Sequence, residues 1–372
     1  MVAWNQYRES DRQRGIAEGN ERETDAALAE AERQRRRAET NEAEAKAQAK
    51  QAKENLTKLH HHLRSYRRTQ QQLGTSLWAG SQFEDAEDAY RIAIQTSFQL
   101  EEAFGSTFSI LFDRQRAYKS LGGLLAETGD LKGAAEAYRN AITTLHEILE
   151  DQTPASQRWI ASRSQLAWDN TQLGNVLYAS GDAREARECW KKSAAFYEQV
   201  INNEPSRASW YIFKWAWLLA TCPDPRFRDA SIAMQLAEKS VEQDSRIAEF
   251  SNLALGIAQY RAGRWKVAID TLKESMTLDR TGRSTGASGF FISMAYWKVD
   301  DKAAARQWYE KSARWMVEKR ALWVYRNHAI RQDLPRFRDE AAELLEINNQ
   351  RPDEQAAQPA DGLINTNPEL SP

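Results

Sequence analysis

Small and bulky apolar residues recur at fixed spacing along the middle of this chain, with polar residues between them. Each copy of the pattern begins with a Leu-Gly pair, and an alanine follows twelve residues after the glycine. A bulky residue comes four positions later, and another small residue three positions after that. The copies begin at Gly74, Gly122, Gly174 and Gly256. Internal repetition of this kind predicts stacked supersecondary units instead of one globular core.

The repeated positions predict two antiparallel helices per unit that cross closely. Side-chain bulk sets the distance between helix axes, so a glycine in the first helix and an alanine in the second allow close contact. The bulky residue, which is Tyr90, Tyr138 or Trp190, then inserts its ring where the small residues leave room. The last small residue of each copy, such as Ser193, is expected to allow the same close approach by the following unit.

Short Gly-Asp pairs predict the turns between the two helices of a unit. Gly129-Asp130 and Gly181-Asp182 lie at this place in their units. Glycine can adopt the left-handed conformation that ends a helix, and aspartate can accept from the free amides that open the next helix. Asp300-Asp301 is interpreted in the same way, as a turn and a helix cap.

The order of these features resembles the tetratricopeptide repeat (TPR), a helix–turn–helix unit of about 34 residues. Tyr118 stands at the leading aromatic position before its Leu-Gly pair, and two less regular units complete a match over residues 68–315. The resemblance implies an all-α fold, a TPR-type right-handed α-solenoid of about six helix pairs within residues 68–345. An amphipathic stretch, Leu334 to Leu345, is expected to form a terminal helix that covers the open end of the array.

The period of the first units is longer than that of the family. Gly122 follows Gly74 by 48 residues and precedes Gly174 by 52. The excess would lengthen each helix by about two turns, or roughly 10–13 Å. Long arrays of this kind, with a segment like Leu218–Asp229, resemble those that follow the catalytic domain of bacterial eukaryotic-like serine/threonine kinases. The sequence has no Gly-rich phosphate loop, strand lysine, His-Arg-Asp loop or Asp-Phe-Gly site, so no kinase activity is expected.

Residues 1–67 are predicted to form a long polar helix. From about residue 15 they are rich in Ala, Glu, Arg, Lys and Gln, which are strong helix formers, and contain no proline. The helix either docks its last turns on the first repeat or forms a coiled coil with weak self-association, because the alanines of its seam bury little area. The seam positions are Ala45, Ala49, Ala52, Leu56, Leu59, Leu63 and Tyr66.

Composition excludes several classes of partner and compartment. A net charge of −2 gives no general attraction to nucleic acid or to an anionic membrane. No apolar run reaches the length of a spanning helix, and the first residues do not begin a secretion signal. We therefore expect a cytoplasmic location, or an extracytoplasmic one if the chain is a fragment of a membrane-anchored kinase. Residues 346–372 lack the apolar content to fold and are predicted to be a disordered tail.

No group of residues predicts chemistry. Cys189 and Cys222 are expected to be reduced thiols packed in helices or beside a loop. The run His60-His61-His62 cannot converge on one metal ion from a single helix, because consecutive side chains point in different directions. We find no nucleophile–base arrangement, and we predict no enzyme activity, no cofactor and no metal site.

The resemblance to the TPR implies a binding surface for a protein or peptide. Stacked units of this family curve so that the first helices line a concave groove, where peptides often bind. Aromatic and arginine side chains, which dominate binding hot spots, occur among the groove positions of this chain. A carboxylate clamp is not expected, since Thr75, Ser120 and Gly123 break its pattern. The predicted groove residues are Arg68, Gln71, Thr75, Trp78, Arg116, Lys119, Trp168, Thr171, Asn175, Tyr178, Tyr260, Arg261, Met294 and Trp297.

Two functions follow as hypotheses. The chain is predicted to be a non-catalytic protein–protein interaction scaffold that binds a partner protein or peptide in its groove. The alternative is a detached regulatory or sensor module of a serine/threonine kinase signalling system, in which another chain carries out phosphorylation.

Overall fold

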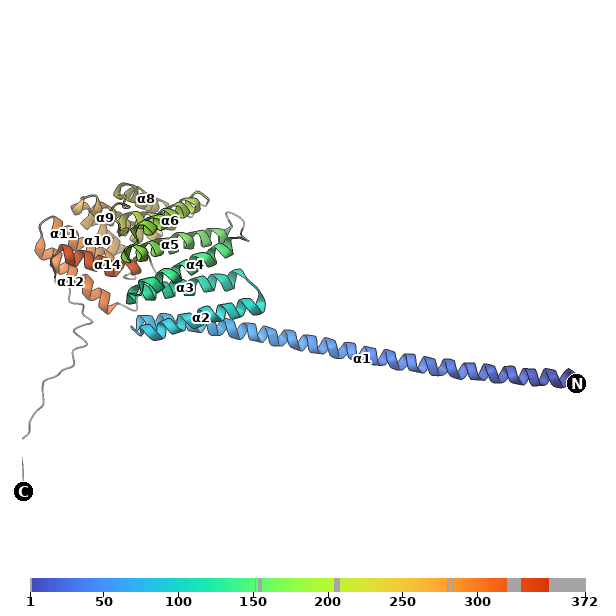
Figure 1. Cartoon of the computed structure of the whole chain (residues 1–372). Coiled ribbons are helices and arrows are strands. Elements are labelled where there is room, and N and C mark those ends of the chain that lie inside the picture. Colours follow the sequence, from blue (N-terminus) through green and yellow to red (C-terminus); the bar gives the residue numbers. More distant parts are fainter. Residues whose placement is uncertain are drawn as a thin grey trace, which may run out of the picture. The chain divides into compact units, whose positions relative to one another are not determined.

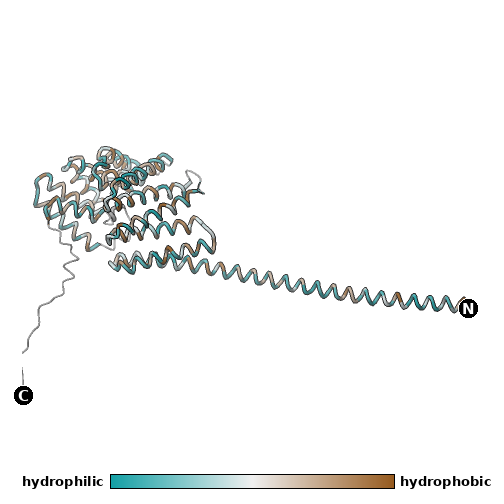
Figure 2. The backbone as a smooth tube through the Cα atoms, viewed as in Figure 1, coloured by the Kyte–Doolittle hydropathy of each residue, from teal (hydrophilic) through white to brown (hydrophobic). Residues whose placement is uncertain are grey.

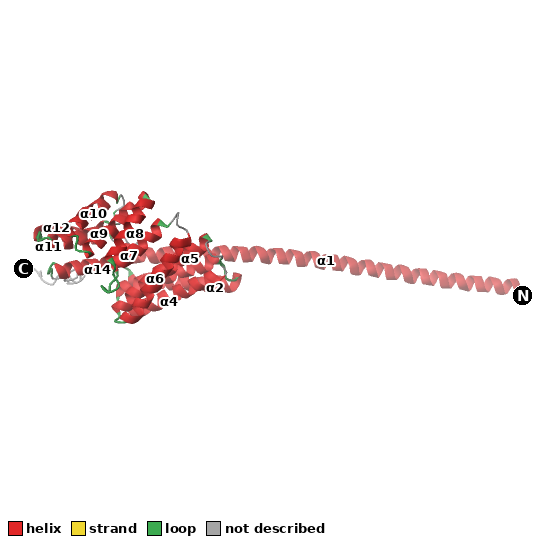
Figure 3. Ribbon diagram, turned by 90° about the horizontal axis from the view of Figure 1, so that it is seen from above, coloured by secondary structure: helices red, strands yellow, loops and turns green. Residues whose placement is uncertain are grey.

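The computed structural model describes residues 2–150, 152, 156–203, 208–279, 282, 284–319 and 329–347. Over these ranges the regular elements are all helices (Figure 1, Figure 3). The chain divides into two compact units, Met1–Ser65 and Tyr66–Pro372. The predicted tail from Asn348 onward lies outside the described residues.

The N-terminal unit is a single helical segment. It belongs to α1, which runs over Val2–Ala79, and hydrophilic residues predominate along it (Figure 2). Pairs such as Arg35–Glu39 and Glu42–Lys46 lie one turn apart on its surface, and each such pair stabilises a helix by about 0.2–0.5 kcal/mol. The predicted long helix is confirmed. Leu56 and Leu59 of the predicted seam are exposed, and a coiled coil stays a prediction.

The second unit is a solenoid of antiparallel helix pairs, which confirms the predicted fold class. Residues 66–79 of α1 form the first helix of the first pair. A short 3₁₀ turn, η2 (Ser245–Ile247), precedes the fifth pair. The remaining helices of the six described pairs are α2 (Phe83–Phe104), α3 (Phe108–Thr128), α4 (Leu131–Glu150), α5 (Gln157–Ala179), α6 (Ala183–Asn203), α7 (Ser209–Thr221), α8 (Ala230–Gln243), α9 (Ala248–Arg261), α10 (Trp265–Leu278), α11 (Thr285–Lys298) and α12 (Lys302–Glu318).

Helix length changes along the array. Helices α2 to α6 contain 20 to 23 residues, as the long period of the first units predicts. Helices α7 to α11 contain only 13 or 14. The predicted lengthening is therefore found in the first three units, where the extra residues are concentrated, and the next helices have no such excess.

The contact between glycine and a bulky residue sets the spacing of the helices. A Cβ atom placed on Gly74 would lie 2.8 Å from the ring of Tyr90, and one on Gly256 would lie 2.6 Å from Leu272. Gly174 is the tightest of the series, since its Cβ would lie 2.5 Å from Nε1 of Trp190. The predicted insertion of a bulky side chain against each glycine is confirmed.

Serine at the last small position does more than allow close approach. Ser193 Oγ donates a hydrogen bond to the carbonyl of Ala167 at 2.6 Å, and Ser275 Oγ donates to that of Glu249 at 2.6 Å. Both carbonyls belong to the first helix of the same unit. At the equivalent position of the fourth pair, Ser240 Oγ also lies 2.8 Å from Ser251 Oγ of the following unit, so this position serves both neighbours. The hydroxyl fastens the two helices of one pair, because a buried hydroxyl needs a partner.

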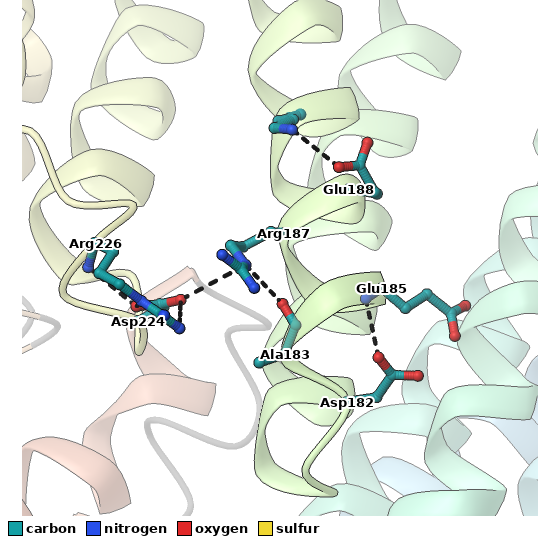
Figure 4. Close-up of polar contacts among 8 residues, drawn as sticks. Asp182, Ala183, Glu185, Arg187, Glu188, Asp224 and Arg226 are labelled. Atoms are coloured by element: carbon teal, nitrogen blue, oxygen red, sulfur yellow. Dashed lines mark hydrogen bonds and ion pairs between the residues drawn. The ribbon is translucent and has the colours of Figure 1, made fainter.

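The turns between helices follow the Gly-Asp pattern. Gly129 has a φ of 90° and Gly181 a φ of 94°, in the left-handed region that favours glycine. Asp182 then accepts a hydrogen bond from the backbone N–H of Glu185 at 3.0 Å, a contact drawn in Figure 4. The predicted turns and N-caps are confirmed at both places, and Asp301 caps α12 in the same way.

The glycine contact predicts the effect of Gly174→Ala. Alanine favours a helix over glycine by about 1 kcal/mol, but overpacking of a core costs about 1–3 kcal/mol. We expect a net loss of stability, measured as a lower midpoint of urea unfolding. Gly19→Ala is the control, because no atom lies within 4 Å of its Cβ position. A Gly174→Ala protein as stable as the parent would show that close crossing does not hold this pair together.

Candidate protein-binding groove

Neighbouring first helices of the second unit lie side by side and present one face, which we call the first-helix face. It is formed by residues 66–79 of α1 with α3, α5, α7, α9 and α11. Hydrogen bonds join successive helices of this face: Gln71 Nε2 donates to Ser120 Oγ at 3.1 Å, and Lys119 Nζ donates to Gln165 Oε1 at 3.2 Å. Every predicted groove residue lies on one of these helices.

The structure divides the predicted groove residues by exposure. Arg68 and Arg116 are exposed. A second group is half-buried and consists of Gln71, Thr75, Lys119, Asn175, Tyr178, Arg261 and Trp297. The rest are buried: Trp78, Trp168, Thr171, Tyr260 and Met294.

Several of these side chains also hold the array together. Trp78 Nε1 donates to Glu127 Oε2 at 2.8 Å, which joins α1 to α3. Asn175 Oδ1 accepts from the indole of Trp190 at 3.1 Å. Residues that sequence reasoning assigned to binding therefore carry structural contacts as well.

A buried polar cluster lies under the first-helix face. Asp169 of α5 is completely buried and accepts from Gln115 Nε2 of α3 at 2.6 Å. Burial raises the pKa of Asp169 to about 6, although the charges of Lys119 and Lys214 oppose the shift. Lys214 of α7 lies over the rings of Trp168 and Trp210 at 5.7 and 5.9 Å. Burial and the like charge of Lys119 lower the pKa of Lys214 to about 8.

The last described helix, α14 (Ala329–Leu344), lies on the later part of the first-helix face. Phe337 is fully buried, with ring centroids 5.8 Å from Trp217 and 4.9 Å from Phe291. Trp217 Nε1 donates to Asp333 Oδ2 at 2.8 Å. The predicted terminal helix thus reaches α7 as well as the end of the array.

Arginine–carboxylate contacts fasten α14 at further points. The Arg261 guanidinium makes a two-point contact with the Glu340 carboxylate. These charges, together with Arg228 and Arg336, keep the pKa of Glu340 below its usual value despite burial. Arg336 also donates to the carbonyl of Thr221 at 2.7 Å. The predicted groove residue Arg261 is therefore engaged by the chain's own helix.

A pocket of about 920 Å³ lies along one side of α14. Its walls come from α1, α3, α4 and α5, from the turn after α7 and from α14. The lining residues are Trp78, Gly123, Ala126, Glu127, Leu131, Tyr138, Gln172, Asn175, Val176, Tyr178, Ala179, Pro223, Pro225, Arg228, Asp333, Pro335, Arg336, Asp339, Glu340 and Glu343. Three predicted groove residues, Trp78, Asn175 and Tyr178, meet in this pocket.

The turn after α7 is fixed by its own polar contacts. Asp224 is 1% exposed and accepts from Arg226 at 3.0 Å, while Arg187 of α6 lies 3.9 Å away (Figure 4). The hydrogen bond from Arg226 lowers the pKa of Asp224. Arg228 Nε donates to the carbonyl of Cys222 at 2.6 Å. These contacts hold Pro223 and Pro225 in place as one wall of the pocket.

The sequence analysis did not predict that α14 and the turn after α7 form one side of the pocket. The acidic residues Asp339 and Glu343, on the polar side of the amphipathic stretch, could have indicated this wall. It also did not predict the buried cluster around Asp169, because the polar residues near Trp168 were interpreted only as groove positions. Neither the pocket wall formed by α14 and the turn nor this cluster follows the repeat period.

Comparison with known proteins identifies one unit directly. Residues 171–205 match the family described as tetratricopeptide repeat, and these residues form most of the α5–α6 pair. No curated protein matches the chain.

Three solved structures are similar at a distance. PilF of Pseudomonas aeruginosa is 18% identical with a TM-score of 0.33, covering 62% of this chain and 88% of PilF. The TPR2AB domain of yeast Sti1, solved with pHSP90, is 15% identical with a TM-score of 0.27, covering 76% and 99%. Yeast Tom70 is 11% identical with a TM-score of 0.28, covering 72% and 61%.

The described part of the chain was also searched for reactive cysteines, metal sites and membrane-spanning helices. Cys189 and Cys222 are free and buried, as predicted, and burial raises the pKa of each thiol, to about 11 and about 12. Within the described ranges no three His, Cys, Asp or Glu side chains gather as metal ligands. None of the described helices combines the length and apolar character needed to cross a lipid bilayer.

The buried cluster predicts a pH dependence of stability. A carboxyl group whose pKa is higher in the folded than in the unfolded chain stabilises the fold while it is protonated. This stabilisation is lost as pH rises from the unfolded pKa through the folded pKa. For Asp169 this window runs from about pH 4 to about pH 6, and the loss amounts to at most about 3 kcal/mol. We expect Asp169→Asn to gain stability relative to the parent between pH 4 and pH 7, measured by urea unfolding.

The control for this prediction is Asp270→Asn, which changes an exposed carboxyl on α10. Its stability difference from the parent should stay flat over the same range. A flat difference for Asp169→Asn would mean that Asp169 is not desolvated in the folded chain.

The packing of α14 predicts the effect of Phe337→Ala. Truncation of a fully buried phenylalanine costs about 3–5 kcal/mol, so the urea midpoint should fall well below that of the parent. Val267→Ala is the control, because Val267 is 51% exposed and surface changes cost less than about 0.5 kcal/mol. Equal midpoints for the two variants would contradict the docking of α14.

Proposed function

We propose that this chain is a non-catalytic protein-interaction scaffold whose first-helix face holds a segment of a partner protein. The observation that carries the proposal is the position of α14. This helix already occupies the later part of the face, with Phe337 in an aromatic site and Glu340 on Arg261. A surface that takes up a helix of its own chain has the chemistry to take up a segment of another.

The earlier part of the face is proposed as the partner site. Arg68 and Arg116 are exposed there, with the half-buried Tyr178 beyond them. Arginine and aromatic side chains are the residue types that most often carry binding energy. Trp297, over which Lys302 Nζ lies at 3.7 Å, is assigned to the far end of the same surface.

The second candidate is a regulatory or sensor module of a serine/threonine kinase system. What favours it is the sequence resemblance of the Leu218–Asp229 segment and the long first units. This function uses the same face, with a component of the kinase system as the partner. Weak self-association through residues 1–67 would bring two such faces into one assembly.

The scaffold is tested by affinity capture with the full chain and mass spectrometry of the bound proteins. Arg68→Ala combined with Arg116→Ala should weaken capture at least tenfold, since hot-spot arginines contribute about 1–2 kcal/mol or more each. Arg184→Ala with Arg306→Ala is the matched control, because both arginines are exposed on second helices. Equal capture by the two double variants would reject the first-helix face as the partner site.

A further inference from the structure

We propose that the pocket beside α14 binds an arginine side chain of a partner segment, with apolar residues of that segment against its prolines and tyrosine. This inference rests on the proposed scaffold function and names the side chain that the scaffold recognises. The pocket is the one lined by Tyr178, Pro223, Pro225, Glu127, Asp339 and Glu343 among others.

The pocket offers ring and proline surfaces to an apolar or cationic group. Tyr178 is half-buried, and its ring is tilted at 47° to that of Trp190 at 5.7 Å. Pro223 is half-buried and Pro225 exposed, on a turn that Asp224 and Arg226 hold rigid. A guanidinium group stacks well on an aromatic face, because it is planar and weakly hydrated.

Charge in the pocket favours a cation. Its lining includes five carboxylates, namely Glu127, Asp333, Asp339, Glu340 and Glu343, against two guanidinium groups, Arg228 and Arg336. Arg336 forms an ion pair with Asp333 at 2.8 Å, and Arg228 donates to the carbonyl of Cys222. Glu340 is paired with Arg261, so three carboxylates of the lining, Glu127, Asp339 and Glu343, stand against Arg228. An anionic ligand would meet the excess of carboxylates.

The chain itself provides a template for this recognition. Arg261 lies over the rings of Phe291 and Tyr260 at 5.1 and 5.5 Å and is clamped by Glu340 of α14. Glu343 lies one helical turn further along α14 and faces the pocket. Within the described residues it has no ion pair or hydrogen bond with another side chain. The carboxylate is therefore placed to repeat, for an incoming arginine, the contact that Glu340 makes with Arg261.

In the proposed complex the cation lies against Glu127, Asp339 and Glu343 of the lining. Burial and the neighbouring Arg261 lower the pKa of Arg228 to about 10, so a second cation beside Arg228 would meet the same repulsion. Arg338 Nε and Nη2 both donate to Asp339 Oδ1, at 2.9 and 2.8 Å, so Asp339 Oδ2 keeps lone pairs for a further donor.

The experiment selects a phage-displayed library of random ten-residue peptides against the immobilised full chain. We expect the selected peptides to be enriched in arginine beside proline or leucine. One selected peptide is then synthesised with arginine and with citrulline, its neutral isostere, and both are measured by fluorescence anisotropy. Citrulline should weaken binding about five- to tenfold, the loss expected for one cation–aromatic contact with an ion pair.

A variant of the pocket tests whether the preference for arginine over citrulline depends on the pocket carboxylates. Asp339→Asn combined with Glu343→Gln should weaken the arginine peptide by about the same factor and leave the citrulline peptide unchanged. Both side chains are exposed, so the fold should tolerate the change. Glu136→Gln with Glu198→Gln is the control, because these exposed carboxylates lie on second helices α4 and α6, and both peptides should bind it as they bind the parent.

Three results would overturn the inference: selection of acidic peptides, equal affinity of the two peptides, or failure to select any peptide. If affinity capture still depends on Arg68 and Arg116 in those cases, the scaffold function stands and only the arginine site is wrong. If the full chain neither captures a protein nor selects a peptide, the scaffold function fails as well.

Discussion

The closeness of the two helices in each pair governs the rest of this fold. Gly74, Gly122, Gly174 and Gly256 each face a bulky residue sixteen positions later, so closely that an added Cβ atom would lie only 2.5 to 3.0 Å from it. Since this contact fixes how the second helix lies on the first, it also fixes which side of the first helix stays open. The first-helix face is the side of the first helices that does not pack against the bulky residues of the second helices.

An open face of this kind needs its own lateral contacts, because each unit of a solenoid touches only its neighbours. Polar pairs such as Gln71–Ser120 and Gln115–Asp169 supply them between successive first helices. Such pairs fix register, since a shift of one turn would leave buried polar atoms without partners. Residues on the first-helix face can therefore be indispensable to the architecture of the solenoid.

Local spacing was enough to predict the helix pairs, the glycine contacts and the Gly-Asp turns, because each involves residues of one unit. It could not place α14. The contacts of this helix span 116 residues from Trp217 to Asp333 and 79 from Arg261 to Glu340. An amphipathic pattern shows that a helix has an apolar side, but it does not show which apolar surface of the protein this side packs against. For the same reason the sequence offered Arg261 as a binding residue and missed Glu343.

The position of α14 also explains why the two ends of the face differ in composition. Beneath α14 the first-helix face is apolar, with Trp217 and Phe291 almost fully buried against Phe337. Left bare, such a surface would be a large exposed apolar patch and an aggregation liability. The earlier first helices carry Arg68, Gln71 and Arg116, whose polar groups water can solvate. Helix α14 thus covers an apolar part of the first-helix face, and the part that it leaves uncovered carries polar residues.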